Sequence, residues 1–204
     1  MDYIEKYKLC VWACRQIHYW KCKTHKHHIR PKSLYGHLAE DPKNIVVVPE
    51  IAHWAMHKWL LAHYRQTGNH EAVQKMSRVD MEKFINDGRP ESPYDFSRES
   101  QILDLVFEKA EAVARTSLDL KKAVEIHNAV VAETKNKGTK KEVMALREPT
   151  RGLLHEATEN KSQAYRDFSR LNDIVSKTFS TSDGLDEYAE EDVLSLVQRE
   201  EAMR

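Results

Sequence analysis

The sequence lacks long hydrophobic runs, paired cysteines and a net charge. No stretch approaches the roughly 18 apolar residues that a membrane-spanning helix requires, so we expect no membrane partner. The three cysteines, Cys10, Cys14 and Cys22, are an odd set near one end of the chain and fit reduced thiols better than a disulfide framework. They match no common zinc-finger spacing, and Cys10 and Cys14 are better explained as small core residues of a helix.

The first residues, MDYIEKYKLC, are charged and contain no apolar segment of the kind found in secretory signals. We therefore expect an intracellular, cytoplasmic protein. Its zero net charge conceals an uneven distribution, because residues 1–90 hold 15 lysines and arginines against 9 acidic residues, and nine of the eleven histidines. The remaining 114 residues hold 17 against 23. A net charge of +6 in the first part favours contact with a polyanion there.

Glycine and proline are scarce, with six of each in 204 residues, and their positions divide the chain. In the first part, three- to four-residue apolar spacing alternates with short β-branched or extended runs. This pattern predicts a helix at residues 2–22, strands at 27–30 and 45–48, and helices at 50–64 and 71–85. The order strand, loop, strand, helix indicates a small antiparallel hairpin that leads into a helix.

The clearest break lies at residues 86–93, where glycine, proline and small polar residues gather. Beyond it, helical spacing predicts two long helices that form a hairpin or small bundle. These helices are expected at residues 97–135 and 139–179, the second interrupted near Pro149, with a break at 180–184 before a short acidic helix. We therefore predict a first domain at residues 1–87, a linker at 88–96 and a helical extension at 97–204.

Histidines in the first part have the spacing of a metal site. A hydrolytic metal site needs neutral imidazoles or carboxylates that converge on one ion and leave positions open for water and substrate. His53 and His57 are four residues apart on a predicted helix, so they share one face and can bind one ion. His27 and His28 are adjacent on a predicted strand, which sends their side chains to opposite faces. We expect these two histidines to have different roles.

The order of these residues resembles the HNH endonuclease motif. The similarity lies in His27-His28-Ile29-Arg30-Pro31-Lys32-Ser33, Asn44-Ile45-Val46 and His53-Trp54-Ala55-Met56-His57, and it reaches the preceding helix with Tyr3 and Tyr7. It covers roughly residues 1–85. The motif most resembles the form common in free-standing phage and intron-associated nucleases, and the steps from Asn44 to His53 and to His57 also resemble bacteriocin DNases of the colicin type.

The resemblance implies a ββα-metal module with one divalent metal ion. His27, His53 and His57 would bind the ion, and His28 would be the general base. Asn44 would hold the two strands in register and orient His28. Many enzymes of this form use Mg²⁺ or Mn²⁺, and three imidazoles also suit Zn²⁺ or Ni²⁺.

Three cations beside the predicted catalytic strand, Lys26, Arg30 and Lys32, fit contacts with the phosphates of DNA. The alternative for them is a solvated surface. We expect surface or packing roles for His25, His37 and His63.

These observations predict an α+β protein, in which a leading helix and a small ββα-metal module precede an all-α extension. The predicted function is endonucleolytic hydrolysis of DNA by a one-metal mechanism, consistent with a phage-encoded protein that acts in the host cytoplasm. The alternative is a non-catalytic DNA-binding or interaction protein that retains the module as a structural metal site. The extension could form a homodimer, bind a protein partner, or lay Lys121, Lys122, Lys140 and Lys141 along DNA.

Overall fold

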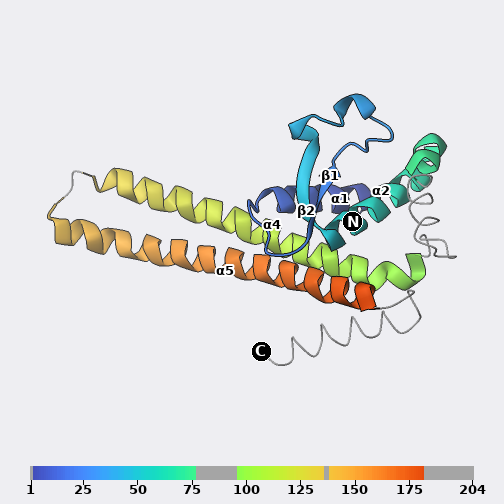
Figure 1. Ribbon diagram of the computed structural model, residues 1–204. Helices are drawn as coiled ribbons and strands as arrows, with labels where there is room; N and C mark the ends of the chain where they lie inside the picture. Colours follow the sequence, from blue (N-terminus) through green and yellow to red (C-terminus); the bar gives the residue numbers. More distant parts are fainter. Residues whose placement is uncertain (1, 77–95, 136–137, 182–204) are drawn as a thin grey trace.

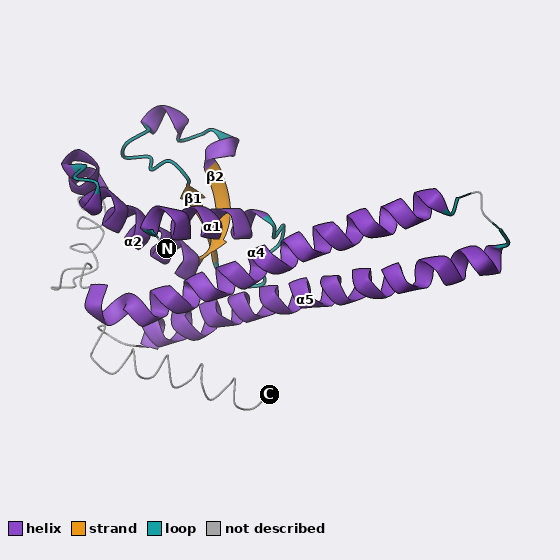
Figure 2. Cartoon of the chain, turned by 180° about the vertical axis from the view of Figure 1, so that it is seen from behind, coloured by secondary structure: helices purple, strands orange, loops and turns teal. Residues whose placement is uncertain are grey.

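The computed structural model describes residues 2–76, 96–135 and 138–181. Helices dominate, and one small antiparallel sheet accompanies them (Figures 1 and 2), so the mixed α+β class is confirmed. In chain order the elements are α1 Tyr3–Arg15, β1 Thr24–His28, the 3-10 turns η1 Gly36–Leu38 and η2 Pro42–Asn44, β2 Ile45–Pro49, α2 Glu50–Gln66, α4 Phe96–Glu133 and α5 Lys140–Thr181.

Strands β1 and β2 pair in a register that places Thr24 opposite Pro49 and His28 opposite Ile45. The second predicted strand and the helix after it are confirmed. The first strand begins three residues earlier than predicted and ends at His28, because Ile29 and Arg30 already turn into the loop. Side chains alternate along both strands, so that His27 and its partner Val46 are buried while Val47 is exposed.

Helix α1 ends at Arg15, seven residues before the predicted end at residue 22. The amides of Gln16 and Ile17 donate to carbonyl oxygens three residues back, which closes the last turn. The chain then leaves the helix to bury Trp20, whose ring packs against Tyr165 and Phe168 of α5. Tertiary packing of this indole therefore overrides an apolar spacing that would allow the helix to continue.

Helices α4 and α5 lie side by side and antiparallel, and their far ends extend beyond the rest of the molecule (Figure 1). The predicted helical hairpin is thus confirmed, but the interruption near Pro149 is wrong, because α5 continues through this residue. Contacts with α4 hold the helix on both sides of the proline. The Arg147 guanidinium donates to Thr134 and to the Val131 carbonyl, and Thr150 bonds to His127.

One hydrophobic cluster joins both halves of the chain. It combines residues of α1, β2 and α2 with residues of α4 and α5, and its largest buried side chains include Trp59, Met56 and Phe168. The Trp59 ring meets Phe107 of α4 edge-on at 6.3 Å between centroids. Cys10 and Cys14 are buried in this core, as predicted. Among the described helices, none has the length and apolar character to cross a membrane.

Several predictions fall outside the described residues. The predicted helix at 71–85 is seen as far as Met76, and the linker at 88–96 is described only at Phe96, where α4 begins. The break at 180–184 is described only at Ser180 and Thr181, which are still helical, and the acidic helix after it lies wholly outside.

Candidate metal centre

His27 reaches the site from β1, which contacts α2. Alternation along the strand turns His27 inward and leaves Lys26 exposed, and His27 is only 1% accessible. Burial is the main cause that lowers the pKa of His27 to about 2, and the neighbouring rings of His57, His53 and His28 lower it further. This imidazole is therefore neutral across the physiological pH range, as a metal ligand must be.

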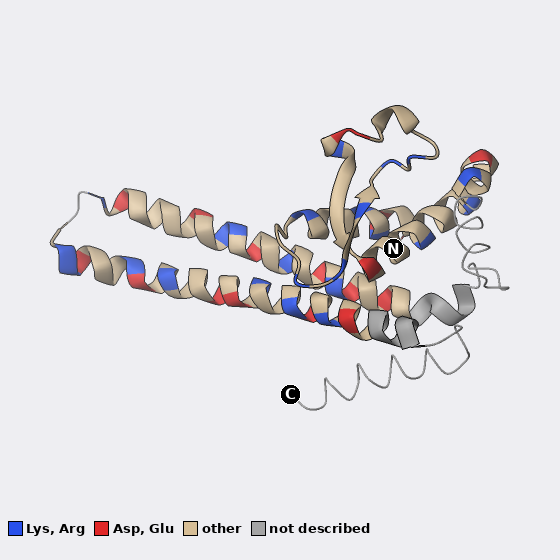
Figure 3. Ribbon diagram, in the orientation of Figure 1, with Lys and Arg blue, Asp and Glu red and all other residues tan. Residues whose placement is uncertain are grey.

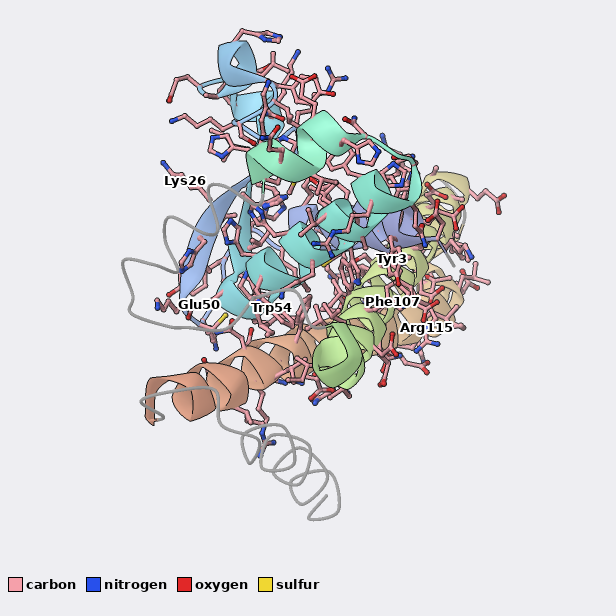
Figure 4. The ribbon with its side chains drawn as sticks, turned by 90° about the vertical axis from the view of Figure 1, so that its right-hand side faces the viewer. Tyr3, Lys26, Glu50, Trp54, Phe107 and Arg115 are labelled. Atoms are coloured by element: carbon pink, nitrogen blue, oxygen red, sulfur yellow. The ribbon has the colours of Figure 1, made fainter. Side chains whose placement is uncertain are left out.

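His53 and His57 reach the site from α2, one helical turn apart. The helix starts directly after Pro49, which supplies no side-chain cap. Its cap comes instead from α5, where the side-chain oxygen of Asn172 accepts a hydrogen bond of 3.0 Å from the Ile51 amide. Helix α2 follows β2 without a loop. The position of its first turn therefore determines which face of α2 lies against β1 (Figure 4).

The three histidines converge. One ring nitrogen of each lies within 4.8 Å of the others, which makes His27, His53 and His57 the only group of three potential metal ligands found in the described residues. The ring centroids are 5.2 Å apart for His27–His53 and for His27–His57, and 4.7 Å apart for His53–His57. The three predicted metal ligands therefore form one cluster that could hold a metal ion.

A buried and unsatisfied atom supports a ligand at this cluster. His27 Nδ1 is buried and has no hydrogen-bond partner among the described residues. The other ring nitrogen, Nε2, lies 3.1 Å from the Tyr7 hydroxyl. In a metal-free protein, a buried nitrogen whose lone pair accepts no hydrogen bond lowers the stability of the folded state. Nδ1 would be satisfied by a cation shared with the two helix histidines, so the residues present fit a divalent metal ion.

His28 stands apart from the cluster, as adjacent positions on a strand require. Its Nε2 lies 3.0 Å from the carbonyl oxygen of Ala39, in the loop between the strands. A carbonyl only accepts, so Nε2 carries the proton and Nδ1 is left with a lone pair. His28 is only half-buried, and this lone pair is the feature that a proton acceptor needs.

Asn44 does not orient His28 directly, which corrects the predicted contact. Its buried side chain accepts from the Arg30 amide at 2.7 Å and donates to the carbonyls of Arg30 and Leu38, each at 3.1 Å. Asn44 therefore links the end of β1 to Leu38 in the loop. The next residue of that loop, Ala39, supplies the carbonyl that bonds to the His28 ring. The influence of Asn44 on His28 passes through the backbone.

The three predicted phosphate contacts are exposed. Lys26 points outward from β1 in Figure 4, and Arg30 and Lys32 lie in the loop after it. The Arg30 guanidinium carbon lies 5.8 Å from the centre of the Tyr35 ring. Figure 3 shows lysine and arginine positions on β1 and on this loop. None of the three belongs to the histidine cluster.

Three further residues border the cluster, and the sequence pattern placed none of them there. Tyr7 from α1 bonds to His27, and the His25 ring lies 5.3 Å from that of His53. Glu50 lies 3.4 Å from His25 Nε2 and pairs with Lys23 at 2.7 Å. The spacing of Glu50, His53 and His57 along one helix face could have indicated Glu50, but no spacing indicates a contact between Tyr7 and His27.

Comparisons with family models, curated proteins and solved structures found no match to this chain. The function of the chain is therefore inferred from the geometry of its described residues.

Proposed function

We propose that this chain is an HNH-type endonuclease that hydrolyses DNA phosphodiester bonds with one divalent metal ion. The observation that carries the proposal is the convergence of His27, His53 and His57, with His28 next to His27 on β1. The order β1, β2, α2 supports a ββα-metal module, because β1 supplies His27, α2 supplies His53 and His57, and β2 pairs with β1 and leads directly into α2.

The number of ligands favours catalysis over a structural role. Structural zinc sites are almost always closed by four protein ligands, whereas catalytic sites keep a position open for water or substrate. The described residues supply three ligands in this cluster. A structural ββα-metal module in a binding protein remains the second candidate, and it would need a further ligand to close the site.

The proposed chemistry assigns the proton transfer to His28. Its Nε2 proton is engaged by the Ala39 carbonyl, so its Nδ1 can accept a proton from a water molecule that attacks phosphorus. Asn44 fixes the loop that supplies this carbonyl and so keeps the tautomer constant. A bound divalent metal ion would polarise a phosphate oxygen and stabilise the departing 3′ oxygen. The departing 3′ oxygen would take a proton from solvent water, so that the products would carry 5′-phosphate and 3′-hydroxyl ends.

Binding of DNA would begin at the exposed cations around the loop. Lys26, Arg30 and Lys32 carry no competing ion pair with the described acidic residues, and each could neutralise one phosphate. Such contacts give affinity and position without reading the sequence. Binding should therefore weaken steeply as salt rises.

Cleavage of supercoiled plasmid tests the proposal. Purified wild type is assayed with Mg²⁺, Mn²⁺ or Zn²⁺, with EDTA, and beside His28→Ala and His37→Ala. His37 is an exposed histidine in the loop between β1 and β2, and it serves as the matched control. We expect nicked or linear product from wild type and His37→Ala, none with EDTA, and a rate about 10²–10⁴-fold lower for His28→Ala.

The second candidate makes a different prediction for the same samples. If wild type binds a metal ion through the three histidines but cleaves no plasmid with any of the three metals, the chain is a structural metal module rather than a nuclease. Equal cleavage by His28→Ala and wild type would remove His28 from the mechanism.

A further inference from the structure

We propose that Tyr7 is the positioning residue that holds His27 in its Nε2–H tautomer and thereby presents Nδ1 as the metal-ligand atom. The inference rests on the proposed metal site, but not on nuclease activity. Through Tyr7, helix α1 would take part in the metal centre although it supplies none of the three ligands.

The single proton of the Tyr7 hydroxyl determines the direction of both hydrogen bonds that Tyr7 forms. The Tyr7 hydroxyl has one proton, and it lies 2.6 Å from the Ile29 carbonyl oxygen and 3.1 Å from His27 Nε2. The carbonyl can only accept, so the hydroxyl proton goes to Ile29. The tyrosine oxygen then has only lone pairs to offer to His27. Nε2 must therefore be the protonated nitrogen of a neutral His27 ring.

The consequence appears on the other side of the ring. When Nε2 carries the proton, Nδ1 has a lone pair, and Nδ1 is buried without a hydrogen-bond partner in the described residues. The opposite tautomer would direct an N–H bond into the cluster of His53 and His57. A metal ion could bind His27 Nδ1 only after that proton had left. Because the bond to Tyr7 keeps the proton on Nε2, no proton has to leave Nδ1 before a metal ion binds.

Tyr7 is itself held firmly. Its side chain is 3% exposed, and its ring lies 5.8 Å from the His27 ring in an edge-on arrangement. The acceptor Ile29 is fixed as well, because its amide donates to the Asn44 carbonyl at 2.8 Å. The chain of bonds from Ile29 through Tyr7 to His27 therefore starts at a backbone group that the hairpin holds in place.

Tyr7→Phe removes the hydroxyl and keeps the ring, and Tyr3→Phe is the matched control. Tyr3 lies one turn earlier on the same helix and is partly buried, and it is not the tyrosine that bonds to His27. Zinc titration of the full chain measures affinity. Loss of a partner that orients a metal-bound histidine typically weakens binding by about 10–100-fold. We expect this loss for Tyr7→Phe and a change below about twofold for Tyr3→Phe.

Nitrogen-15 NMR of the histidine rings in the metal-free protein provides the second readout. Wild type and Tyr3→Phe should show His27 as the Nε2–H tautomer alone, whereas Tyr7→Phe should show a mixture with the Nδ1–H form. A role of Tyr7 in packing alone would lower the unfolding temperature without changing the tautomer. Thermal unfolding of all three proteins separates this case.

Two results would overturn the inference. One is a Tyr7→Phe protein that binds Zn²⁺ as tightly as wild type with an unchanged His27 tautomer. The other is a wild type that binds no Zn²⁺, or shows the Nδ1–H tautomer. Neither experiment contains DNA, so a protein that binds Zn²⁺ through a Tyr7-dependent His27 and cuts no plasmid would leave this inference intact while the proposed nuclease fails.

Discussion

His27 and His28 are neighbours in sequence, yet they form their hydrogen bonds on different sides of the strand. Each ring uses Nε2 for a bond within the protein, His27 to Tyr7 and His28 to the Ala39 carbonyl. Each therefore has Nδ1 left without a hydrogen bond to a described residue. The two-residue period of a strand is what would allow a single dipeptide to supply both the proposed metal ligand and the proposed proton acceptor.

The buried His27 should make the metal-free protein sensitive to acid. Its pKa is about 2 in the folded state and 6.5 in an unperturbed state, so the unfolded chain binds one more proton between these values. The stability contributed by neutral His27 is complete above pH 6.5 and is lost as the pH falls below it. We expect up to about 1.4 kcal/mol of lost unfolding free energy for each pH unit.

Urea unfolding in EDTA between pH 7.5 and pH 4, at roughly half-unit steps, measures this slope. His27→Gln has an amide that does not titrate, and it keeps every other histidine. The wild-type curve should fall relative to the His27→Gln curve by about 1 kcal/mol per pH unit below pH 6.5. Parallel curves would show that His27 does not stay neutral in the folded protein.

Helix α2 carries two of the three cluster histidines, and its first turn depends on a residue far along the chain. Asn172 of α5 is completely buried and accepts from the Ile51 amide, 121 residues earlier. A helix N-terminus has amides without helical partners, and Pro49 leaves this one without a local cap. The helical hairpin thus fixes the start of the helix that presents His53 and His57.

Replacing Asn172 by alanine should destabilise the protein by about 1–2 kcal/mol, which is the usual cost of losing a side-chain cap. The Ile51 amide would then be buried without an acceptor, and α2 would fray at the end nearest His53. Asn160→Ala, at an exposed position of the same helix, is the control and should change stability by less than about 0.5 kcal/mol. Urea unfolding compares the two, and equal stabilities would rule out the cap.

Most elements were predictable from the sequence, because local spacing determines them. The β-branched run Ile45–Val48 and the apolar face of α2 depend on neighbours one to four residues away. The end of α1, the continuation of α5 through Pro149 and the Asn172 cap depend on contacts between distant segments, for which spacing carries no signal. The pairing of His53 with His57 was predictable for the same local reason, whereas the place of His27 beside them came from the resemblance to the HNH motif. The contact of Tyr7 with His27 was not predicted, since 20 residues separate the two.

At the scale of the whole molecule, the helical hairpin has a proximal and a distal part. The proximal part packs against α1 and α2 through large apolar side chains, such as Val106, Val113, Phe168 and Leu171. The distal part, residues 121–156, buries mainly small side chains such as Ala123, Thr134 and Thr150. The proximal part therefore belongs to the core that supports the histidine cluster, and the distal part projects from it (Figure 1).

We therefore expect residues 1–87 alone to be unfolded. Each large apolar side chain buried between the hairpin and the first part contributes about 1.5–3 kcal/mol, and several together equal the whole stability of a small domain, about 5–15 kcal/mol. A chain that lacks only residues 121–156 keeps these contacts. Its two helices would face each other at Leu120 and Ala157 and could be joined by roughly five glycine and serine residues.

Circular dichroism and zinc titration distinguish the two deletions. The chain without its distal part should unfold cooperatively and bind Zn²⁺ with wild-type affinity, because the cap at Asn172 and the packing of Trp20, Trp59 and Phe107 are all retained. The fragment of residues 1–87 should show neither property. If that fragment unfolds cooperatively and binds Zn²⁺, the metal centre is an autonomous unit and α4 and α5 serve another purpose.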